Sequence, residues 1–498
     1  MAIKDDSCAT KSPWKGEDRR ALRDRSGKRP HCRYPAGLPV RRRALDAYTV
    51  LGNRACRFDS MKIYFLNSAW MMADTVVGRV MGVLVTVVVA RYLGPEDFGM
   101  YAYVMSMVAL FGVIGHMGLD GLLIRELLDE PRMQSETLGI AFVMKSAGFG
   151  LAALGLLMFG LLMPGNLPAE RWLFVLASLA VAIQPVSAVL SNWFRSRVEA
   201  RYAVVSNFVG VMAGGAFKVG AVLAGAGVVA VGVGQTLGIA VGAVLLVVMF
   251  LRHGGPAPGT WSFSRKRARA MLGESAMIFV GSIFAVIYLK IDQVMLRAMQ
   301  GPETVGIYSI ASLLSESLYF IPAAIAGTAF PRLVQINAGD PEAFAERLQD
   351  VFDILATSAL IVLVGLLALG PLAISLAMGP SYSPAVPIFL VHVLSLPFIF
   401  LRQGFSRWMI IKNLARFSMV TQGAGALLNI GLNLVLIPQF GGMGAAVATL
   451  VSYAAASYFA LLLSLGTRPI FYMMTRSLFQ PWRGIRKLTV LFRKLRNG

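Results

Sequence analysis

The stretch VARYLGPEDFGMY, residues 89–101, returns later in the chain as MQGPETVGIY, residues 299–308. Gly, Pro, Glu, Gly and Tyr recur at the same spacing in both copies. Pro and the first Gly favour a turn, and the second Gly allows a close backbone approach where the next helix starts. We therefore expect structural roles for Gly94, Pro95, Gly99 and Tyr101, and for Gly301, Pro302, Gly306 and Tyr308. The repeat predicts a chain built as two similar halves.

Both copies of the repeat lie between long apolar blocks. The 498 residues are 56% hydrophobic and 15% charged, with a mean hydropathy of +0.65, whereas a soluble domain carries roughly a quarter charged residues. A spanning helix needs about 20 mostly apolar residues, and about twelve blocks meet this requirement. They are 63–90, 97–124, 136–163, 171–194, 202–224, 228–251, 272–296, 304–330, 352–378, 385–411, 416–437 and 442–465. We therefore predict an all-α integral membrane protein.

Lys and Arg are concentrated in every second connection between these blocks. The outer connections hold only Arg91, Arg171 and Arg297, whereas the cytoplasmic ones hold clusters such as Arg195, Arg197 and Arg201. The positive-inside rule therefore predicts cytoplasmic N- and C-termini. Both repeat loops then lie on the outer side, so the two six-helix halves are parallel repeats around a central cavity.

This pattern divides the chain into five parts. We expect a basic cytoplasmic tail over 1–60, a six-helix bundle over 61–252, a cytoplasmic linker over 253–271, a second bundle over 272–466 and a basic amphipathic tail over 467–498. The segment from Met61 resembles the natural start of a membrane protein. The residues before it are therefore either a disordered cytoplasmic extension or the result of a start codon assigned too far upstream. The last part is expected to lie on anionic lipid.

Several function classes are excluded by what the sequence contains. The net charge of +21 lies mostly in the tails and the cytoplasmic connections, which argues against nucleic-acid binding. The chain has no P-loop, no His-Glu-x-x-His motif and no Gly-x-Ser-x-Gly motif. All three cysteines precede Met61, so the membrane part has no Cys-based metal site. We expect no enzyme, no ATP site, no cofactor and no metal.

Ionisable side chains inside the spans are costly and are candidates for function. Five basic residues from both halves predict a cationic cavity for an anionic substrate, such as a diphosphate head group or an acidic sugar. They are Arg79, Lys145, Lys218, Lys290 and Arg402. The alternative for Arg79, Lys218 and Lys145 is structural pairing with a carboxylate, and of Lys290 and Asp292 one could face the cavity and the other a neighbouring helix. Asp74 and Asp292 each lie close in sequence to a basic residue. Asp120, Arg407 and Arg297 are expected at the membrane interfaces, and His116 as a packed side chain.

Further segments add to the pattern of residues 89–101. They are Gly118-Leu119-Asp120, Ile124-Arg125-Glu126-Leu127, residues 290–296, Pro331-Arg332-Leu333 and residues 437–446. Together they resemble the polysaccharide-biosynthesis flippases, the O-antigen and exopolysaccharide translocases of the multidrug/oligosaccharidyl-lipid/polysaccharide (MOP) superfamily. The resemblance covers roughly 62–466.

The resemblance implies a flippase that moves undecaprenyl-diphosphate-linked oligosaccharide repeat units across the bacterial inner membrane by alternating access. It implies an ion gradient or membrane potential as the driving force, with Asp74, Asp292 and Glu316 as coupling candidates and the five basic residues as head-group ligands. The implied partners are the lipid-linked oligosaccharide, membrane lipids, and a polysaccharide polymerase with its export machinery.

Three other functions stay open at this point. A cation-coupled drug exporter of the same superfamily would favour an acidic or apolar cavity. A peptidoglycan-precursor flippase of a sister family would have fourteen spans, which the basic tail after Arg468 does not supply. A membrane-embedded enzyme or a scaffold for polysaccharide assembly would move no substrate.

Overall fold

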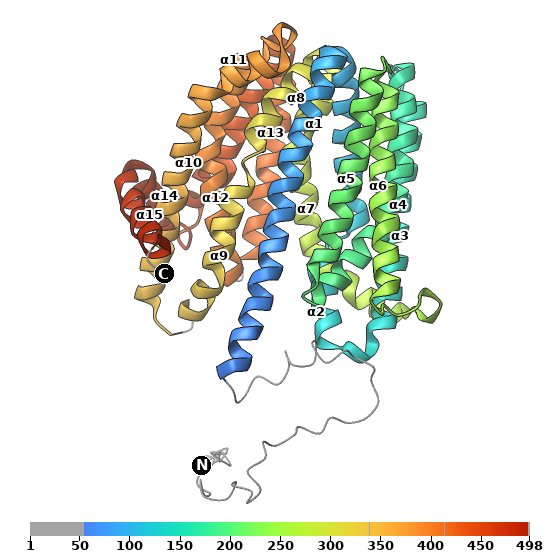
Figure 1. The fold of residues 1–498 in the computed structure, drawn as a ribbon. Coiled ribbons are helices and arrows are strands. Elements are labelled where there is room, and N and C mark those ends of the chain that lie inside the picture. Colours follow the sequence, from blue (N-terminus) through green and yellow to red (C-terminus); the bar gives the residue numbers. More distant parts are fainter. Residues whose placement is uncertain (1–53, 338, 413, 497–498) are drawn as a thin grey trace, which may run out of the picture. The chain divides into compact units, whose positions relative to one another are not determined.

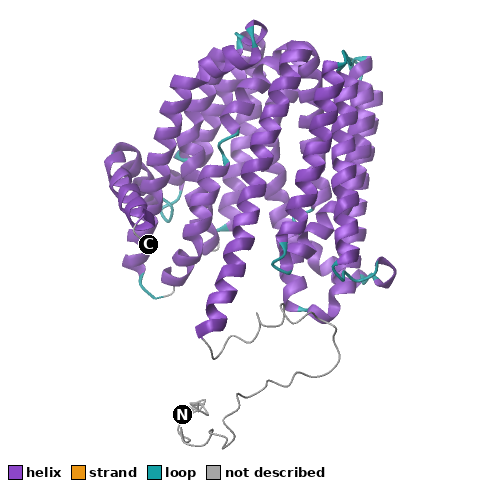
Figure 2. Ribbon diagram, in the orientation of Figure 1, coloured by secondary structure: helices purple, strands orange, loops and turns teal. Residues whose placement is uncertain are grey.

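The structure, a computed structural model, describes residues 54–337, 339–412 and 414–496, and these residues form helices and no strands (Figure 2). The chain divides into two units, residues 1–61 and residues 62–498. The expected tail over 1–60 lies outside the described residues up to position 53. The all-α membrane fold predicted from the sequence is confirmed.

Two long helices each contain two membrane spans. Helix α1 (Arg54–His116) is interrupted at Gly94, and α13 (Ala415–Ser457) at Gly441, where the backbone has positive φ. A straight helix would separate Gly78 from Asp120 by roughly 60 Å, yet both line one cavity, so the chain doubles back at Gly94 (Figure 1). The described residues form ten long apolar helical stretches. Two of them hold two spans each, which agrees with the twelve spans predicted.

The remaining helices follow in chain order, with short 3₁₀ turns between some of them. The first half contains α2 (Asp120–Asp129), α3 (Gln134–Leu162), α4 (Pro168–Ser196), α5 (Ala200–Leu223) and α6 (Val228–Arg252). The second contains α7 (Arg265–Gln300), α8 (Pro302–Glu316), α9 (Phe320–Asn337), α10 (Pro341–Met378), α11 (Ala385–His392) and α12 (Leu396–Ile411) with α13. Helices α14 (Arg468–Phe479) and α15 (Pro481–Arg496) end the chain.

Three boundaries differ from the sequence prediction. The predicted spans 304–330 and 385–411 are each interrupted, between α8 and α9 and between α11 and α12. Pro322 and Pro397 explain the breaks, because a proline ring clashes with the carbonyl group four residues earlier. Helix α7 begins at Arg265 and not at 272, because the Ser264 hydroxyl accepts a hydrogen bond from the Arg267 amide and caps the helix.

The two repeat loops bind one another across the halves. Gly94 and Gly301 have nearly the same backbone angles, φ 78° and ψ 173° against φ 90° and ψ 176°, a region open only to glycine. A Cβ atom on Gly99 would overlap the Pro302 carbonyl oxygen, and one on Gly306 would overlap the Pro95 carbonyl oxygen. We call this reciprocal contact the repeat-loop clasp, and the end of the helices that carries it the repeat-loop end.

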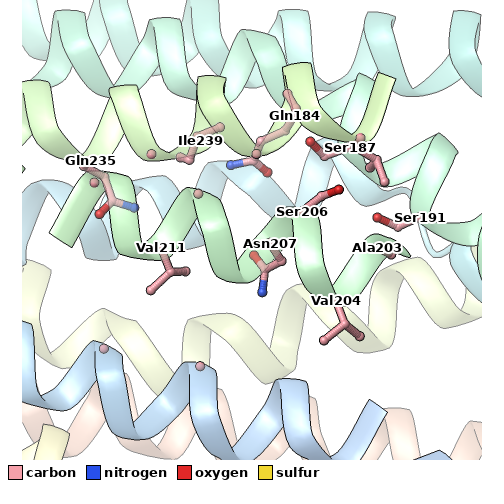
Figure 3. Close-up of a pocket in the computed structure, with 18 of the residues that line it drawn as sticks. Gln184, Ser187, Ser191, Ala203, Val204, Ser206, Asn207, Val211, Gln235 and Ile239 are labelled. Atoms are coloured by element: carbon pink, nitrogen blue, oxygen red, sulfur yellow. The ribbon is translucent and has the colours of Figure 1, made fainter. Parts of the chain in front are cut away.

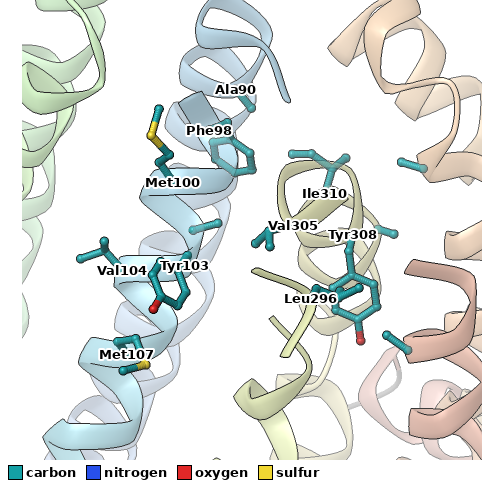
Figure 4. Packing of buried hydrophobic residues seen from close by; sticks show 14 of the residues in the cluster. Ala90, Phe98, Met100, Tyr103, Val104, Met107, Leu296, Val305, Tyr308 and Ile310 are labelled. Atoms are coloured by element: carbon teal, nitrogen blue, oxygen red, sulfur yellow. The ribbon is translucent and has the colours of Figure 1, made fainter. Parts of the chain in front are cut away.

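Apolar and polar contacts surround the clasp. Figure 4 shows Phe98 of α1 on the side of its helix that faces Val305 and Ile310 of α8, and the three residues belong to one buried cluster. Arg297 of α7 forms an ion pair with the fully buried Glu170 of α4 at 2.6 Å, so Arg297 joins the halves in addition to lying near the helix ends. The Tyr382 hydroxyl donates to the Ala90 carbonyl at 2.9 Å, and burial raises the pKa of this hydroxyl.

The C-terminal helices pack against α10 and not only against lipid. The fully buried Asp353 of α10 accepts hydrogen bonds from Arg483, Lys487 and Ser477. A Cβ atom on Gly484 would overlap Thr357 of α10, which fixes a close contact with α15. Two basic side chains of the tail therefore contact the protein, whereas Trp482, Ile485 and Val490 are exposed. Arg483 and Lys487 therefore bind within the protein, and the position of this tail on anionic lipid stays a prediction.

Candidate functional site

A polar cavity of about 700 Å³ lies inside the first half, between α1, α4, α5 and α6. Figure 3 shows Gln184, Ser187 and Ser191 of α4 and Asn207 of α5 among the side chains that line it. Most of these groups are neutral and both donate and accept hydrogen bonds. The cavity therefore offers a surface that suits hydroxyl-rich ligands.

Small residues bring α5 and α6 together along one wall of this cavity. A Cβ atom on Gly210 would lie 2.6 Å from the Gly238 carbonyl oxygen, and one on Gly214 would lie 2.7 Å from the Gly234 carbonyl oxygen. Helices in membranes pack this closely where glycines recur every four residues. The same glycines line the cavity, so part of its wall is bare backbone.

Lys218 lies at the repeat-loop end of the cavity. Its ammonium group donates to the Tyr101 hydroxyl at 3.2 Å and to the Gln235 side-chain oxygen. Tyr101 in turn donates to Gln235 at 3.2 Å. Among the described residues no carboxylate pairs with Lys218, so its positive charge is available to a ligand. Lys218 is the one member of the predicted cationic set that lines this cavity.

Asp120 lies at the opposite end of the cavity, where an interface residue was expected. Its carboxylate accepts from Lys145 at 2.8 Å and from Asn192 at 2.7 Å, and His116 lies 3.1 Å away. Lys145 is fully buried and does not line the cavity. The structure therefore places Lys145 in the structural pairing that was its alternative, where it neutralises a cavity carboxylate.

A second group of predicted residues lies where the halves approach each other. Lys290 of α7 and Glu316 of α8 form an ion pair at 3.1 Å, both about a quarter exposed. Arg79 of α1 donates to the Glu316 backbone carbonyl at 3.5 Å. The structure thus brings together two predicted cations and one predicted coupling acid, but not with Lys218.

Asp292 is buried in the second half among neutral donors. Tyr308 donates to it at 2.7 Å, Asn433 at 2.6 Å and Thr449 at 2.5 Å. No basic side chain pairs with Asp292 in the described part of the chain, and the Asn433 side-chain oxygen is buried without a hydrogen-bond partner. A buried carboxylate is costly unless hydrogen bonds satisfy it, and here neutral side chains from three positions supply those bonds. No group of three or more His, Cys, Asp or Glu residues forms a metal site in the described residues.

Two predicted site residues lie elsewhere. Arg402 of α12 donates to the Ala456 carbonyl at 3.5 Å, and its second terminal nitrogen is buried without a partner. It does not line the polar cavity. The side chain of Asp74 lies outside the described part of the chain.

The neutral wall of the cavity was missed by sequence reasoning, which selected charged groups. Gln184, Ser187 and Ser191 recur at intervals of three and four, which places them on one face of a helix. Arg195, one further turn along α4, lines the same cavity. This stripe of polar residues on one face of an apolar span is the sequence feature that could have predicted the cavity wall.

Comparison with known proteins gives a consistent result. A family model described as "Polysaccharide biosynthesis protein" matches residues 65–337. A probable low-salt glycan biosynthesis flippase, Agl15, from Haloferax volcanii is 22% identical over 73% of this chain and 76% of its own length. The probable flippase AglR of the same organism is 24% identical over 79% and 82%.

Solved structures share the fold at low sequence identity. The lipid II flippase MurJ in an inward closed conformation matches with a TM-score of 0.65 and 15% identity, over 85% of this chain and 93% of that one. An inward-facing multidrug resistance MATE family transporter of the MOP superfamily matches with a TM-score of 0.63 and 13% identity, over 82% and 99%. These similarities establish the architecture of two membrane-embedded halves.

Proposed function

The chain belongs to the polysaccharide biosynthesis protein family, and on this basis we propose that it is a flippase that moves a lipid-linked oligosaccharide across the bacterial cytoplasmic membrane. The single observation that carries the proposal is the polar cavity of the first half. Its neutral donors and acceptors suit sugar hydroxyl groups, and its size falls in the range of ligand-binding cavities. The two Haloferax relatives named above are described as flippases.

The charges of the cavity support an anionic substrate. Lys218 and Arg195 line it without carboxylate partners among the described residues, whereas Asp120 is neutralised by Lys145. A drug exporter for organic cations would need a cavity with unpaired acidic groups in place of unpaired basic groups. We propose an undecaprenyl-diphosphate-linked repeat unit, with the sugars in the cavity and the lipid chain in the bilayer.

The clasp supports an alternating-access mechanism. The halves meet backbone to backbone at the repeat-loop end, which the positive-inside rule assigns to the outer side. Substrate would enter the cavity from the cytoplasmic side while the clasp is formed, and leave after the clasp separates. The product would then be available to a polysaccharide polymerase and its export machinery.

Asp292 is the acid that we propose for coupling to an ion gradient. Its three neutral donors leave a net negative charge in a buried place. A proton or a monovalent cation would neutralise it, and the unpartnered Asn433 oxygen would serve as a further ligand for a cation. Glu316 is less suited, because Lys290 already compensates its charge.

Replacing Lys218 by Gln tests the substrate site. We expect at least a tenfold lower rate of flipping of a fluorescent lipid-linked oligosaccharide in liposomes, because a charge-assisted hydrogen bond in a dry site contributes about 1.5–3 kcal/mol. The matched control is Lys412→Gln, a lysine outside the cavity that contacts Asn337. Equal rates for both variants, or covalent change of the substrate by the wild type, would refute the proposal.

Replacing Asp292 by Asn tests the coupling. Flipping should lose its dependence on an imposed Na⁺ or pH gradient and fall about tenfold or more, because the amide carries no charge to neutralise. The control is Glu346→Gln, an exposed carboxylate on α10. A variant that still responds to the gradient as the wild type does would remove Asp292 from the mechanism.

A further inference from the structure

A second cavity, of about 410 Å³, lies behind the wall of the polar one. Helices α4 and α6 separate the two: Ser187 and Ser191 of α4 face the polar cavity, whereas Val186 and Leu190, one position earlier in each case, line the second. Successive helical residues point in directions about 100° apart. We call the second space the linker cavity, because the connection between the halves closes it.

Residues 253–264 fold back against the first half and form one side of the linker cavity. Trp261 packs edge-to-face on Phe142 and Phe250, with ring centroids 5.5 and 6.2 Å apart. Its indole nitrogen donates to the Pro256 carbonyl at 3.1 Å. A Cβ atom on Gly139 of α3 would overlap the Ser262 carbonyl oxygen, so the linker contacts α3 closely. The cavity is therefore a built feature of the fold.

The lining and the mouth are apolar. Aromatic and aliphatic side chains form almost the whole wall: Phe142, Val143, Leu190, Phe250, Trp261 and Phe263. Val143, Leu251 and Phe263 are about half exposed, and in a chain that spans the membrane exposed apolar groups of this kind contact lipid. A sugar or a peptide would leave its polar groups unpaired in such a space.

Three basic residues follow the lining residues of the mouth closely in sequence, where the helices end. Arg252 follows Leu251 at the end of α6, and Arg265 and Lys266 follow Phe263 at the start of α7; all three are exposed. None pairs with a carboxylate among the described residues. The nearby Glu126, Glu130 and Glu136 are occupied by Arg267, at 2.9, 3.0 and 3.6 Å. A positive rim therefore borders an apolar space at the depth where helices leave the bilayer.

We propose that the linker cavity binds one hydrocarbon chain of an anionic glycerophospholipid, whose phosphate group is held by Arg252, Arg265 and Lys266. The bilayer supplies the chain, the lining excludes polar ligands, and the rim selects a negative head group. A bound lipid holds residues 253–264 against the first half, and this segment is the covalent connection between the halves. Lipid binding in the linker cavity is independent of the transported substrate.

Quenching of Trp261 by lipids with brominated chains tests the assignment. The chain has seven tryptophans, so the Trp261 signal is taken as the difference between the wild type and Trp261→Phe in nanodiscs. We expect brominated phosphatidylglycerol to quench this signal at a roughly tenfold lower mole fraction than brominated phosphatidylcholine. Arg252→Gln combined with Lys266→Gln should remove this difference.

Two pairs of variants on α3 distinguish lipid binding in the linker cavity from contact of lipid with the rest of the protein surface. Val143→Phe fills the mouth and should abolish the selective quenching, whereas Leu151→Phe, at another lipid-exposed position, should not. Gly139→Val displaces the linker and should abolish the selective quenching as Val143→Phe does. Gly150→Val should leave the selective quenching unchanged, because a side chain at Gly150 has open space around it.

Several results would overturn the proposal. Equal quenching by the two brominated lipids in the wild type would mean ordinary contact with the surrounding bilayer. Unchanged quenching in Val143→Phe would place the lipid elsewhere. Displacement of the brominated lipid by a polyprenyl phosphate at a lower mole fraction than by unlabelled phosphatidylglycerol would assign the cavity to a carrier lipid.

Discussion

Replacing Gly306 by alanine is expected to lower flipping at least tenfold while the protein still inserts into the membrane. The new Cβ atom would overlap the Pro95 carbonyl oxygen of the other half, and backbone cannot move aside as a flexible side chain can. Overpacking of this kind costs about 1–3 kcal/mol. Under the proposed alternating-access mechanism, the cost falls only on the state in which the clasp is formed, so the protein should accumulate with the repeat-loop end separated. Gly99→Ala should act in the same way through Pro302.

The matched control is Gly112→Ala on α1, the helix that also carries Gly99. A Cβ atom at Gly112 meets nothing within 4 Å. The clasped state is measured by cross-linking Arg91→Cys to Ala377→Cys with a bifunctional thiol reagent about as long as an arginine side chain, since the Arg91 guanidinium donates to the Ala377 carbonyl at 3.3 Å. All native cysteines precede Met61 and are readily replaced. If Gly306→Ala cross-links and transports like Gly112→Ala, the halves do not close on these glycines.

Replacing Asp120 by asparagine is expected to lower the free energy of unfolding by about 1–3 kcal/mol, because it leaves the buried Lys145 ammonium group without a countercharge beside a partly exposed position. Lys145→Met should cost less, because Asp120 keeps the hydrogen bond from Asn192 and is partly exposed. The measurement is the midpoint of thermal unfolding in detergent.

The double variant Lys145→Met with Asp120→Asn gives the decisive comparison. It should recover most of the loss, because replacing both members of a buried pair is often nearly neutral. The control Glu346→Gln, at an exposed position, should change the midpoint little. Additive losses in the double variant would show that the two side chains do not act as a pair.

The repeat and the apolar blocks were sufficient to predict the fold. Glycine at positions 94 and 301 and proline after each of them report local backbone geometry, which depends on neighbouring residues and is therefore visible in sequence. The interruptions at Pro322 and Pro397 also follow from local backbone geometry, although the predicted spans did not include them. The reciprocal contact of the loops could not be predicted in this way, because it joins residues from different halves.

The site was predicted less well, for a physical reason. A charge inside a span marks a cost, but the sequence does not say whether a ligand or a distant carboxylate offsets it. Lys145 and Lys290 proved to be paired, with partners 25 and 26 positions away. Of the five predicted cations, only Lys218 is among the described residues that line the polar cavity, and the neutral wall formed by Gln184, Ser187 and Ser191 carries no charge.

The buried carboxylate on α10 has a consequence for how the protein is made. Asp353 enters the membrane region long before its partner Arg483 is synthesised, because 130 positions separate them. A chain that stops before α15 would leave the buried Asp353 carboxylate without the Arg483 guanidinium and the Lys487 ammonium group. We therefore expect such a chain to hold its second half less stably than the full chain does.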